Sequence, residues 1–270
     1  MQSTVTEIAA AVRAGSTTAR AETEAALARI AERDPSIGAF QVVRTEAALR
    51  EADAVDQRPD RFSLPLAGVP IPVKDNVPVS GEPMRIGSAG SDPAPQEFDH
   101  EVVRRLRRAG AIVVGLTRVP ELCVFGATDS TFGVSRNPWD RGRTPGGSSG
   151  GAAAAVASGM VVAAHGNDGL GSIRIPAACC GLVGIKAGFG VVPSGLGDGS
   201  WFGMAENGPL ATTVADCALL LSVLGGRPEL AEVEAAEVAV IESFLPQQLS
   251  EEDTKAAIEA IKAEVGATSI

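Results

Sequence analysis

The chain has 270 residues, of which 45 % are hydrophobic and 21 % are charged, and its formal net charge is −10. This composition indicates a globular protein with a sizeable core and excludes an extensively disordered chain. Surfaces that bind nucleic acid are usually basic, so the negative charge argues against a nucleic-acid partner.

The negative charge is concentrated at the C-terminal end. From Glu229 onward the sequence holds ten acidic and two basic residues, and a Gly-Gly-Arg-Pro stretch just before it ends at Pro228. Such a stretch is typical of a boundary between two parts of a chain. We therefore expect a domain over 1–226 and an acidic tail over 227–270, the tail folding as two amphipathic helices, 229–244 and 251–265.

The sequence gives no sign of export or of membrane insertion. No apolar leader follows Met1, and the longest apolar stretch, 152–164, is interrupted and too short to cross a bilayer. We therefore expect a cytoplasmic protein without a membrane partner. The cysteines show no metal-ligand spacing, and we expect them to be small core residues rather than a disulfide framework: Cys123, Cys179, Cys180 and Cys217.

Apolar periodicity predicts alternating helices and short buried strands. The first part, 5–56, is expected to be helical with a turn and an N-cap near Ser16. Residues 66–76 predict a strand whose prolines restrict it to a sheet edge or a strand end. The remaining helices are expected at 100–109, 149–159 and 213–224, and the strands at 111–115, 160–164 and 182–185. This order indicates an α/β fold with a mostly parallel or mixed sheet flanked by helices.

Lysine is scarce in the predicted domain. Residues 1–228 contain only Lys74 and Lys186, although arginine occurs throughout. Arginine stays charged, whereas burial can bring a lysine to its neutral form and let it act as a base. Because Lys74 follows an apolar strand, we expect it to have such a function.

A glycine-rich run, Gly146-Gly-Ser-Ser-Gly-Gly151, precedes a helix of small residues. A phosphate-binding loop would end in Gly-Lys-Ser or Gly-Lys-Thr, but here alanine follows. A nucleophile elbow would need a preceding strand and a histidine well downstream, and neither requirement is met. The run therefore predicts a loop whose serines, Ser148 among them, face a site at the N-terminus of the helix.

A second glycine-rich turn, Gly169-Leu-Gly171, leads into Ser172. A hydroxyl beside free main-chain N–H groups offers what acyl transfer needs, a nucleophile and an oxyanion hole. Asp168 and Arg174 flank the turn, and we expect them to form a partly buried ion pair.

The sequence contains only two histidines. We expect His100 to lie on the surface at a helix start and His165 to lie in the core, so neither serves as the base of a Ser-His-Asp hydrolase. A desolvated lysine is then the base available to a serine. One histidine with scattered carboxylates does not form a zinc site, and we expect neither a metal nor a cofactor.

Three motifs together resemble the amidase signature family: Pro72-Val-Lys-Asp-Asn76, the run 146–151, and Asp168-Gly-Leu-Gly-Ser-Ile-Arg-Ile-Pro-Ala177. A fourth, Cys180-Gly-Leu-Val-Gly-Ile-Lys186, extends the resemblance, which covers about residues 5 to 225. The resemblance implies a catalytic triad in which Ser172 attacks the amide carbonyl. Ser148, preceded by a cis peptide, would relay the proton to neutral Lys74.

The resemblance also implies that main-chain N–H groups of Gly169, Leu170 and Gly171 hold the oxyanion. Leu170 stands where the family usually has glycine, and a leucine forced to positive φ costs about 1–2 kcal/mol. Domains of the family are close to twice as long as this one. We therefore expect a truncated domain with an incomplete sheet, which a second copy or a partner chain would cover.

The tail resembles a different family. Residues 240–252 and 266–269 are similar to the YqeY family, which is related to a tRNA-contacting module, but an acidic tail suits RNA poorly. Three functions stay open. The chain is an amidase acting on a small-molecule carboxamide, the glutamine-hydrolysing component of a tRNA-dependent amidotransferase, or a non-catalytic truncated or fused chain.

Overall fold

The structure, a computed structural model, describes residues 3–194 and 203–227. The predicted tail helices lie outside the described residues. The described helices are α1 (Val5–Ala14), α2 (Ala19–Ile37), α3 (Thr45–Asp56), α4 (Glu101–Arg108), α5 (Gly150–Ala157), α6 (Arg174–Cys180) and α7 (Val214–Gly225), with two short 3-10 turns, η1 (Arg61–Ser63) and η2 (Glu121–Cys123). The strands are β1 (Phe40–Val43), β2 (Pro70–Lys74), β3 (Ile112–Thr117), β4 (Asp129–Ser130), β5 (Gly133–Val134), β6 (Ala163–Asp168), β7 (Val183–Gly184) and β8 (Glu206–Ala211).

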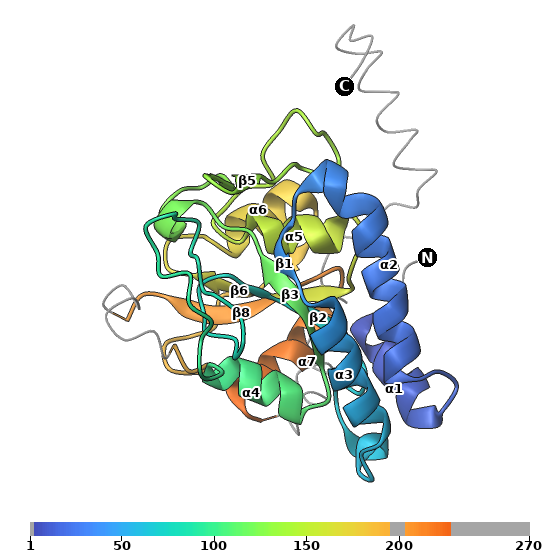
Figure 1. Cartoon of the computed structure of the whole chain (residues 1–270). Helices are drawn as coiled ribbons and strands as arrows, with labels where there is room; N and C mark the ends of the chain where they lie inside the picture. The colour runs from blue at the N-terminus through green and yellow to red at the C-terminus, as the bar shows by residue number, and fades with distance from the viewer. Residues whose placement is uncertain (1–2, 195–202, 228–270) are drawn as a thin grey trace, which may run out of the picture. The chain divides into compact units, whose positions relative to one another are not determined.

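The longer ladders form a central layer between two layers of helices (Figure 1), and β4 and β5 pair separately. Two three-stranded ladders, β1-β3-β2 and β6-β8-β7, lie next to each other through β2 and β6. Helices α5 and α6 cover one side, and α4 and α7 cover the other (Figure 1). Residues of β3 enter both cores, Val113 and Leu116 on the α4 and α7 side, Ile112 and Val114 on the α5 side. The two-residue period of a strand gives the alternation from Ile112 to Val114, and the irregular pairing of β3 with β2 between Val113 and Leu116 shifts it after that.

The sheet is mixed, as predicted. β2 and β3 run parallel, whereas β1 is antiparallel to β3 and β8 is antiparallel to both β6 and β7. The strand expected at 160–164 begins only at Ala163 and continues to Asp168. The helix before it closes at Gly159, which has a φ of +74°, and 160–162 lead the chain back into the sheet.

The N-terminal part is divided more finely than the periodicity indicated. Thr4 and Thr18 cap the first two helices through their side chains, and Gly15 and Gly38 end them in the left-handed conformation. A short strand, β1, then interrupts the stretch expected to be helical throughout. It escaped sequence analysis because four residues are too few to show a strand period.

β2 is the edge strand of its hydrogen-bonded ladder, and Pro70 is its first residue, as the prolines predicted, although β6 lies next to its free side. The main-chain N–H of Asp75 donates to the Thr117 carbonyl of β3 at 3.2 Å, whereas the N–H of Lys74 faces His165 of β6. Successive N–H groups of a strand point to opposite sides, so the nitrogens of Pro70 and Pro72 also face β6, where they can donate nothing. The prolines therefore end the backbone ladder at β2, and β6 lies beside this edge without a backbone ladder.

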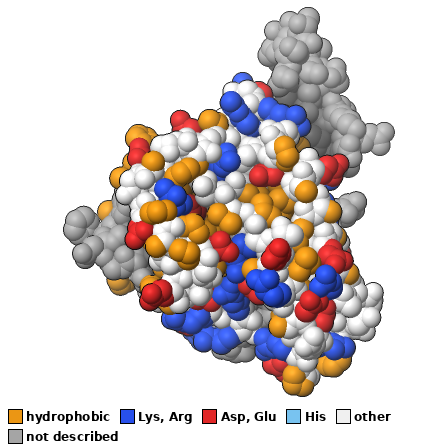
Figure 2. Space-filling model, in the orientation of Figure 1, with side chains coloured by type: hydrophobic (Ala, Val, Ile, Leu, Met, Phe, Trp, Pro, Cys, Tyr) orange, Lys and Arg blue, Asp and Glu red, His pale blue; other side chains and the backbone are white. Residues whose placement is uncertain are grey.

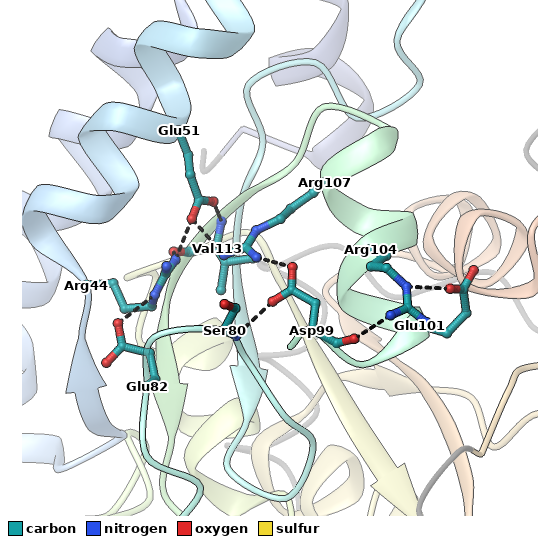
Figure 3. Close-up of polar contacts among 9 residues, drawn as sticks. All are labelled: Arg44, Glu51, Ser80, Glu82, Asp99, Glu101, Arg104, Arg107 and Val113. Atoms are coloured by element: carbon teal, nitrogen blue, oxygen red, sulfur yellow. Dashed lines mark hydrogen bonds and ion pairs between the residues drawn. The ribbon is translucent and has the colours of Figure 1, made fainter. Parts of the chain in front are cut away.

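A network of ion pairs fastens the long segment between β2 and α4 (Figure 3). The buried Arg44 guanidinium contacts Glu51 of α3 at 2.7 Å and Glu82 of the segment at 2.9 Å. Arg107 of α4 bonds both Glu51 and Asp99, the latter near the end of the segment. Positive and negative side chains are interspersed across this face in Figure 2. The network thus holds the segment against two helices.

Replacing Arg44 with alanine should lower the free energy of unfolding by about 3 kcal/mol, because the change leaves two poorly solvated carboxylates without their shared partner. The matched control is Arg50→Ala in α3, the helix that Arg44 precedes. Arg50 pairs with Glu46 at 3.7 Å with both side chains largely exposed, so its loss should cost less than about 0.5 kcal/mol. Urea unfolding followed by circular dichroism measures both. Equal losses would contradict the assigned role of the network.

Candidate active site

Lys74 ends β2 in a fully buried position, with 0 % of its surface exposed. Its Nζ donates to Ser148 Oγ at 2.8 Å and to the Asn167 carbonyl at 3.1 Å. Burial lowers the pKa of Lys74, because an ammonium loses its hydration there, although the charge of Asp168 opposes this effect. The lysine thus has the burial and the contact that a base acting on Ser148 requires.

The glycine-rich run forms a tight loop entering α5. The Gly147–Ser148 peptide bond is cis, as the family resemblance implies. At Gly151 a Cβ atom would lie 2.6 Å from the main-chain oxygens of Ala39 and Arg118, so only glycine lets α5 approach the sheet here. The Ser149 N–H donates to the Ser172 carbonyl at 3.0 Å, which joins the two glycine-rich turns.

Asp168 organises the second turn. Its carboxylate accepts hydrogen bonds from the main-chain N–H groups of Gly171, Ile173 and Arg174 and from the Arg174 guanidinium. Burial alone would raise the pKa of Asp168, but these donors lower it to about 2. The predicted partly buried ion pair is confirmed, with Arg174 Nε 2.9 Å from the carboxylate and more than half exposed.

The three residues expected to form the oxyanion hole differ in their surroundings. Gly171 has a φ of +107°, whereas Leu170 is not in the left-handed region, so the conditional strain at Leu170 does not arise. The Gly171 N–H is engaged by Asp168 at 2.6 Å. Within the described part of the chain, the N–H groups of Gly169 and Leu170 have no acceptor, and both residues line a cavity.

The cavity has a volume of about 260 Å³ and contains Ser148 and Ser172 in its wall. None of its described lining residues is charged, and most are apolar. The Oδ1 atom of Asn76 is buried there without a hydrogen-bond partner in the described structure. The other lining residues are Met84, Ile86, Leu122, Cys123, Val124, Phe125, Gly126, Gly147, Asn167, Gly169, Leu170, Ile175 and Ala205.

Sequence analysis missed part of this wall. Ile86, Leu122 and Cys123 all line the cavity and all adopt positive φ, at 44°, 53° and 60°. Such a conformation is rare for side chains other than glycine and tends to occur at functional sites. Neither composition nor spacing marks these residues in the sequence. Asn76 was quoted only as part of a motif, although its place two residues after Lys74 is a usable signal.

The cysteines are free, and only two are fully in the core. Cys180 and Cys217 are buried, Cys179 is exposed, and Cys123 is partly buried. The core expectation was therefore wrong for Cys179 because α6 turns that side chain outward. Burial raises the pKa of the Cys123 thiol, which lies beside Ser148. Cys123 is thus a neutral thiol in the cavity wall.

Asp75, next to the buried lysine, is also buried. Its carboxylate accepts the Arg85 N–H at 3.0 Å. Burial nevertheless raises the pKa of Asp75 to about 7. A carboxyl group that titrates near neutrality therefore lies beside Lys74 in the chain.

Both histidines are buried and neither contacts Ser148 or Ser172. His165 lies in β6, where one ring nitrogen faces the Lys74 N–H and the other faces Asn207; the core expectation is confirmed. His100 caps α4 as predicted, but it is only 4 % exposed, and its Nε2 bonds the Ser194 carbonyl. The surface expectation for His100 was wrong because 194 packs over this helix start.

The described residues hold no group of three or more His, Cys, Asp or Glu side chains suited to a metal ion. Among the described helices, none is both long and apolar enough to cross a membrane.

Sequence comparisons support one family. A profile described as Amidase matches residues 21–260, which runs past the boundary predicted at 226. The amidase homologue AmiB2 of Mycobacterium tuberculosis is 50 % identical over 209 residues, 77 % of this chain and 45 % of the relative. A glutamyl-tRNA(Gln) amidotransferase subunit from Chromohalobacter salexigens is 39 % identical over 263 residues, 94 % of this chain and 51 % of the relative.

Solved structures of similar fold support the same family. A 6-aminohexanoate cyclic dimer hydrolase complexed with substrate matches with a TM-score of 0.77 and 35 % identity, over 82 % of this chain and 46 % of that one. The peptide amidase of Stenotrophomonas maltophilia matches with a TM-score of 0.72 and 30 % identity, over 92 % of this chain and 51 % of that one. The chain spans about half the length of the relatives it matches. On the profile, the relatives and the fold together, the chain belongs to the amidase signature family.

Proposed function

We propose that the chain hydrolyses the C–N bond of a carboxamide through Lys74, Ser148 and Ser172. The observation that carries the proposal is the 2.8 Å contact between the buried Lys74 Nζ and Ser148 Oγ, in the wall of a cavity that Ser172 also lines. A serine beside a desolvated amine is a nucleophile system that needs no histidine.

In this mechanism Ser172 Oγ attacks the carbonyl carbon of the amide, and its proton passes to Ser148 as the Ser148 proton passes to neutral Lys74. The tetrahedral intermediate collapses with cleavage of the C–N bond, and the Lys74 ammonium returns the proton, through Ser148, to the departing amine. Water then attacks the acyl-enzyme ester by the same proton route, which releases the carboxylic acid and restores Ser172.

We assign the oxyanion hole to the N–H groups of Gly169 and Leu170, because Asp168 already occupies the N–H of Gly171. Asp168 would then act by shaping the turn rather than by touching substrate. Donors fixed in advance at a developing oxyanion are commonly the largest single catalytic contribution. Asn76 Oδ1, buried without a partner in the described residues, offers an acceptor for an amide N–H of the substrate.

The lining of the cavity favours an uncharged carboxamide with an apolar acyl group. Its described residues include no charged side chain, and moving a charged group out of water without a partner is costly. Glutamine hydrolysis is the second candidate, supported by 39 % identity to an amidotransferase component over 94 % of this chain. Glutamine, however, carries an ammonium and a carboxylate, and the described cavity offers neither a partner charge.

A fluorophosphonate probe should label Ser172, because Ser172 Oγ displaces fluoride when Lys74 takes up its proton. Ser172→Ala should abolish labelling, and Lys74→Ala and Ser148→Ala should slow it by about 100-fold or more. Mass spectrometry of the labelled peptide identifies the site. Cys179→Ala is the matched control, since it removes an exposed thiol outside the cavity lining and should leave labelling intact. Folded wild-type chain that takes up no probe would support the non-catalytic alternative.

The labelling rate should rise with pH as Lys74 loses its proton. Burial disfavours the ammonium and lowers the pKa of Lys74 from 10.5, so the midpoint of the rise should lie below that value. Lys74→Arg should be unreactive at every pH, because an arginine stays protonated. Asp75→Asn removes the neighbouring carboxyl that titrates at about 7, and the midpoint should persist in this variant. A midpoint that disappears with Asp75 would assign the rise to the carboxyl instead.

Leu170, whose side chain is 67 % exposed at the cavity, should favour long acyl groups. Leu170→Ala should lower the ratio of kcat/KM for hexanamide to kcat/KM for acetamide by roughly tenfold, because the variant loses apolar contact with the longer chain only. Val134→Ala changes an exposed apolar side chain outside the cavity lining and should leave the ratio unchanged. Glutamine hydrolysed faster than hexanamide by the wild type would favour the second candidate.

A further inference from the structure

We propose that His165 is a positioning residue that holds Lys74 in place across the boundary between β2 and β6, where no backbone ladder forms. The inference rests on the proposed function in one respect, since it takes Lys74 as the base. It adds a residue that contacts neither the cavity nor the two serines.

The absence of a backbone ladder between β2 and β6 has a cause in the sequence. Pro70 and Pro72 turn nitrogens without hydrogen toward β6, so the backbone ladder does not continue across this boundary. Lys74 is the next residue on the same side of the strand, and its N–H needs a partner in a fully buried place. The His165 Nδ1 atom faces it at 3.4 Å, a long hydrogen bond.

The contact belongs to a closed ring of hydrogen bonds. His165 Nε2 lies 3.0 Å from Asn207 Oδ1, which also accepts from Asn167 Nδ2 at 3.3 Å. The Asn167 carbonyl in turn accepts the Lys74 Nζ proton at 3.1 Å. The ring therefore fixes Lys74 at two points, its main chain through His165 and its amine through Asn167.

The ring requires a neutral imidazole with its hydrogen on Nε2, because Nδ1 must accept. Burial lowers the pKa of His165 to about 3, although the bond to Asn207 opposes this. At neutral pH the imidazole thus keeps Nδ1 free for the Lys74 N–H. Since His165 does not line the cavity, its loss should affect the chemical step rather than substrate binding.

Three variants test the inference. His165→Leu removes both polar contacts. His165→Asn keeps an acceptor near the position of Nδ1, toward Lys74, whereas His165→Gln keeps a polar group near the position of Nε2, toward Asn207. The two amide variants have the same chemistry and differ in which contact they retain, so each serves as the control for the other. This comparison holds even if His165→Leu does not fold.

We expect His165→Leu and His165→Gln to lower kcat for carboxamide hydrolysis, and the labelling rate of Ser172, by up to about 100-fold with KM nearly unchanged. His165→Asn should recover both to within about threefold of wild type. A merely structural role would impair the two amide variants equally. Equal impairment, or wild-type kcat in His165→Leu, overturns the inference.

A second readout does not depend on catalysis. Hydrogen exchange of the Lys74 main-chain N–H, followed by NMR, should be slow in wild type and His165→Asn and faster in His165→Gln. If the wild type fails to label at Ser172 but this exchange pattern holds, the proposed function fails and the hydrogen bond stands. If the wild type labels but exchange is the same in all variants, the positioning role fails alone.

Discussion

The site depends on the burial of Lys74 without a charged hydrogen-bond partner. The amine contacts a hydroxyl and a carbonyl, and the nearby carboxylate of Asp168 is engaged by Arg174 and by main-chain N–H groups. An unpaired buried charge is so unfavourable that a lysine gives up its proton instead. The ion pair with Arg174 therefore does more than shape a turn. Because it engages the Asp168 carboxylate, Lys74 makes no direct contact with a carboxylate that would favour its protonated form.

Arg44 shows the opposite response to burial. Its guanidinium cannot lose a proton, so the fold surrounds it with Glu51, Glu82 and a main-chain carbonyl. The same segment that this network fastens carries Met84 and Ile86 into the cavity wall. One buried basic side chain, Arg44, thus has carboxylate partners, whereas the other, Lys74, has no charged hydrogen-bond partner, as the proposed base requires. The two positions could not exchange their residues, since only lysine can become neutral and only arginine stays charged at both contacts.

Much of the fold and of the reactive centre could be predicted from the sequence, because glycine, proline and lysine act locally. The capped helices, the mixed sheet and the partnership of Lys74 with Ser148 follow from motifs that each span a few residues. The prolines correctly predicted that the backbone ladder ends at β2, but they could not predict that β6 lies alongside this edge without a ladder. The cavity wall could not be predicted either. Ile86 and Cys123 line it with positive φ values, and no pattern of side chains in the sequence indicates such values.

The division between chemistry and selectivity follows from where the residues lie. Lys74 and Asp168 end two adjacent strands, and Ser148 lies just before α5. Packing of the sheet and of this helix therefore holds the three residues in place. Leu122, Phe125 and Leu170 stand at the cavity with more than half of their surfaces exposed. Under the proposed mechanism, changes at these exposed positions would alter the acyl group accepted without disturbing the buried proton route. In the mechanism proposed above, a buried reactive centre with an exposed apolar rim would let one set of residues act on different amides.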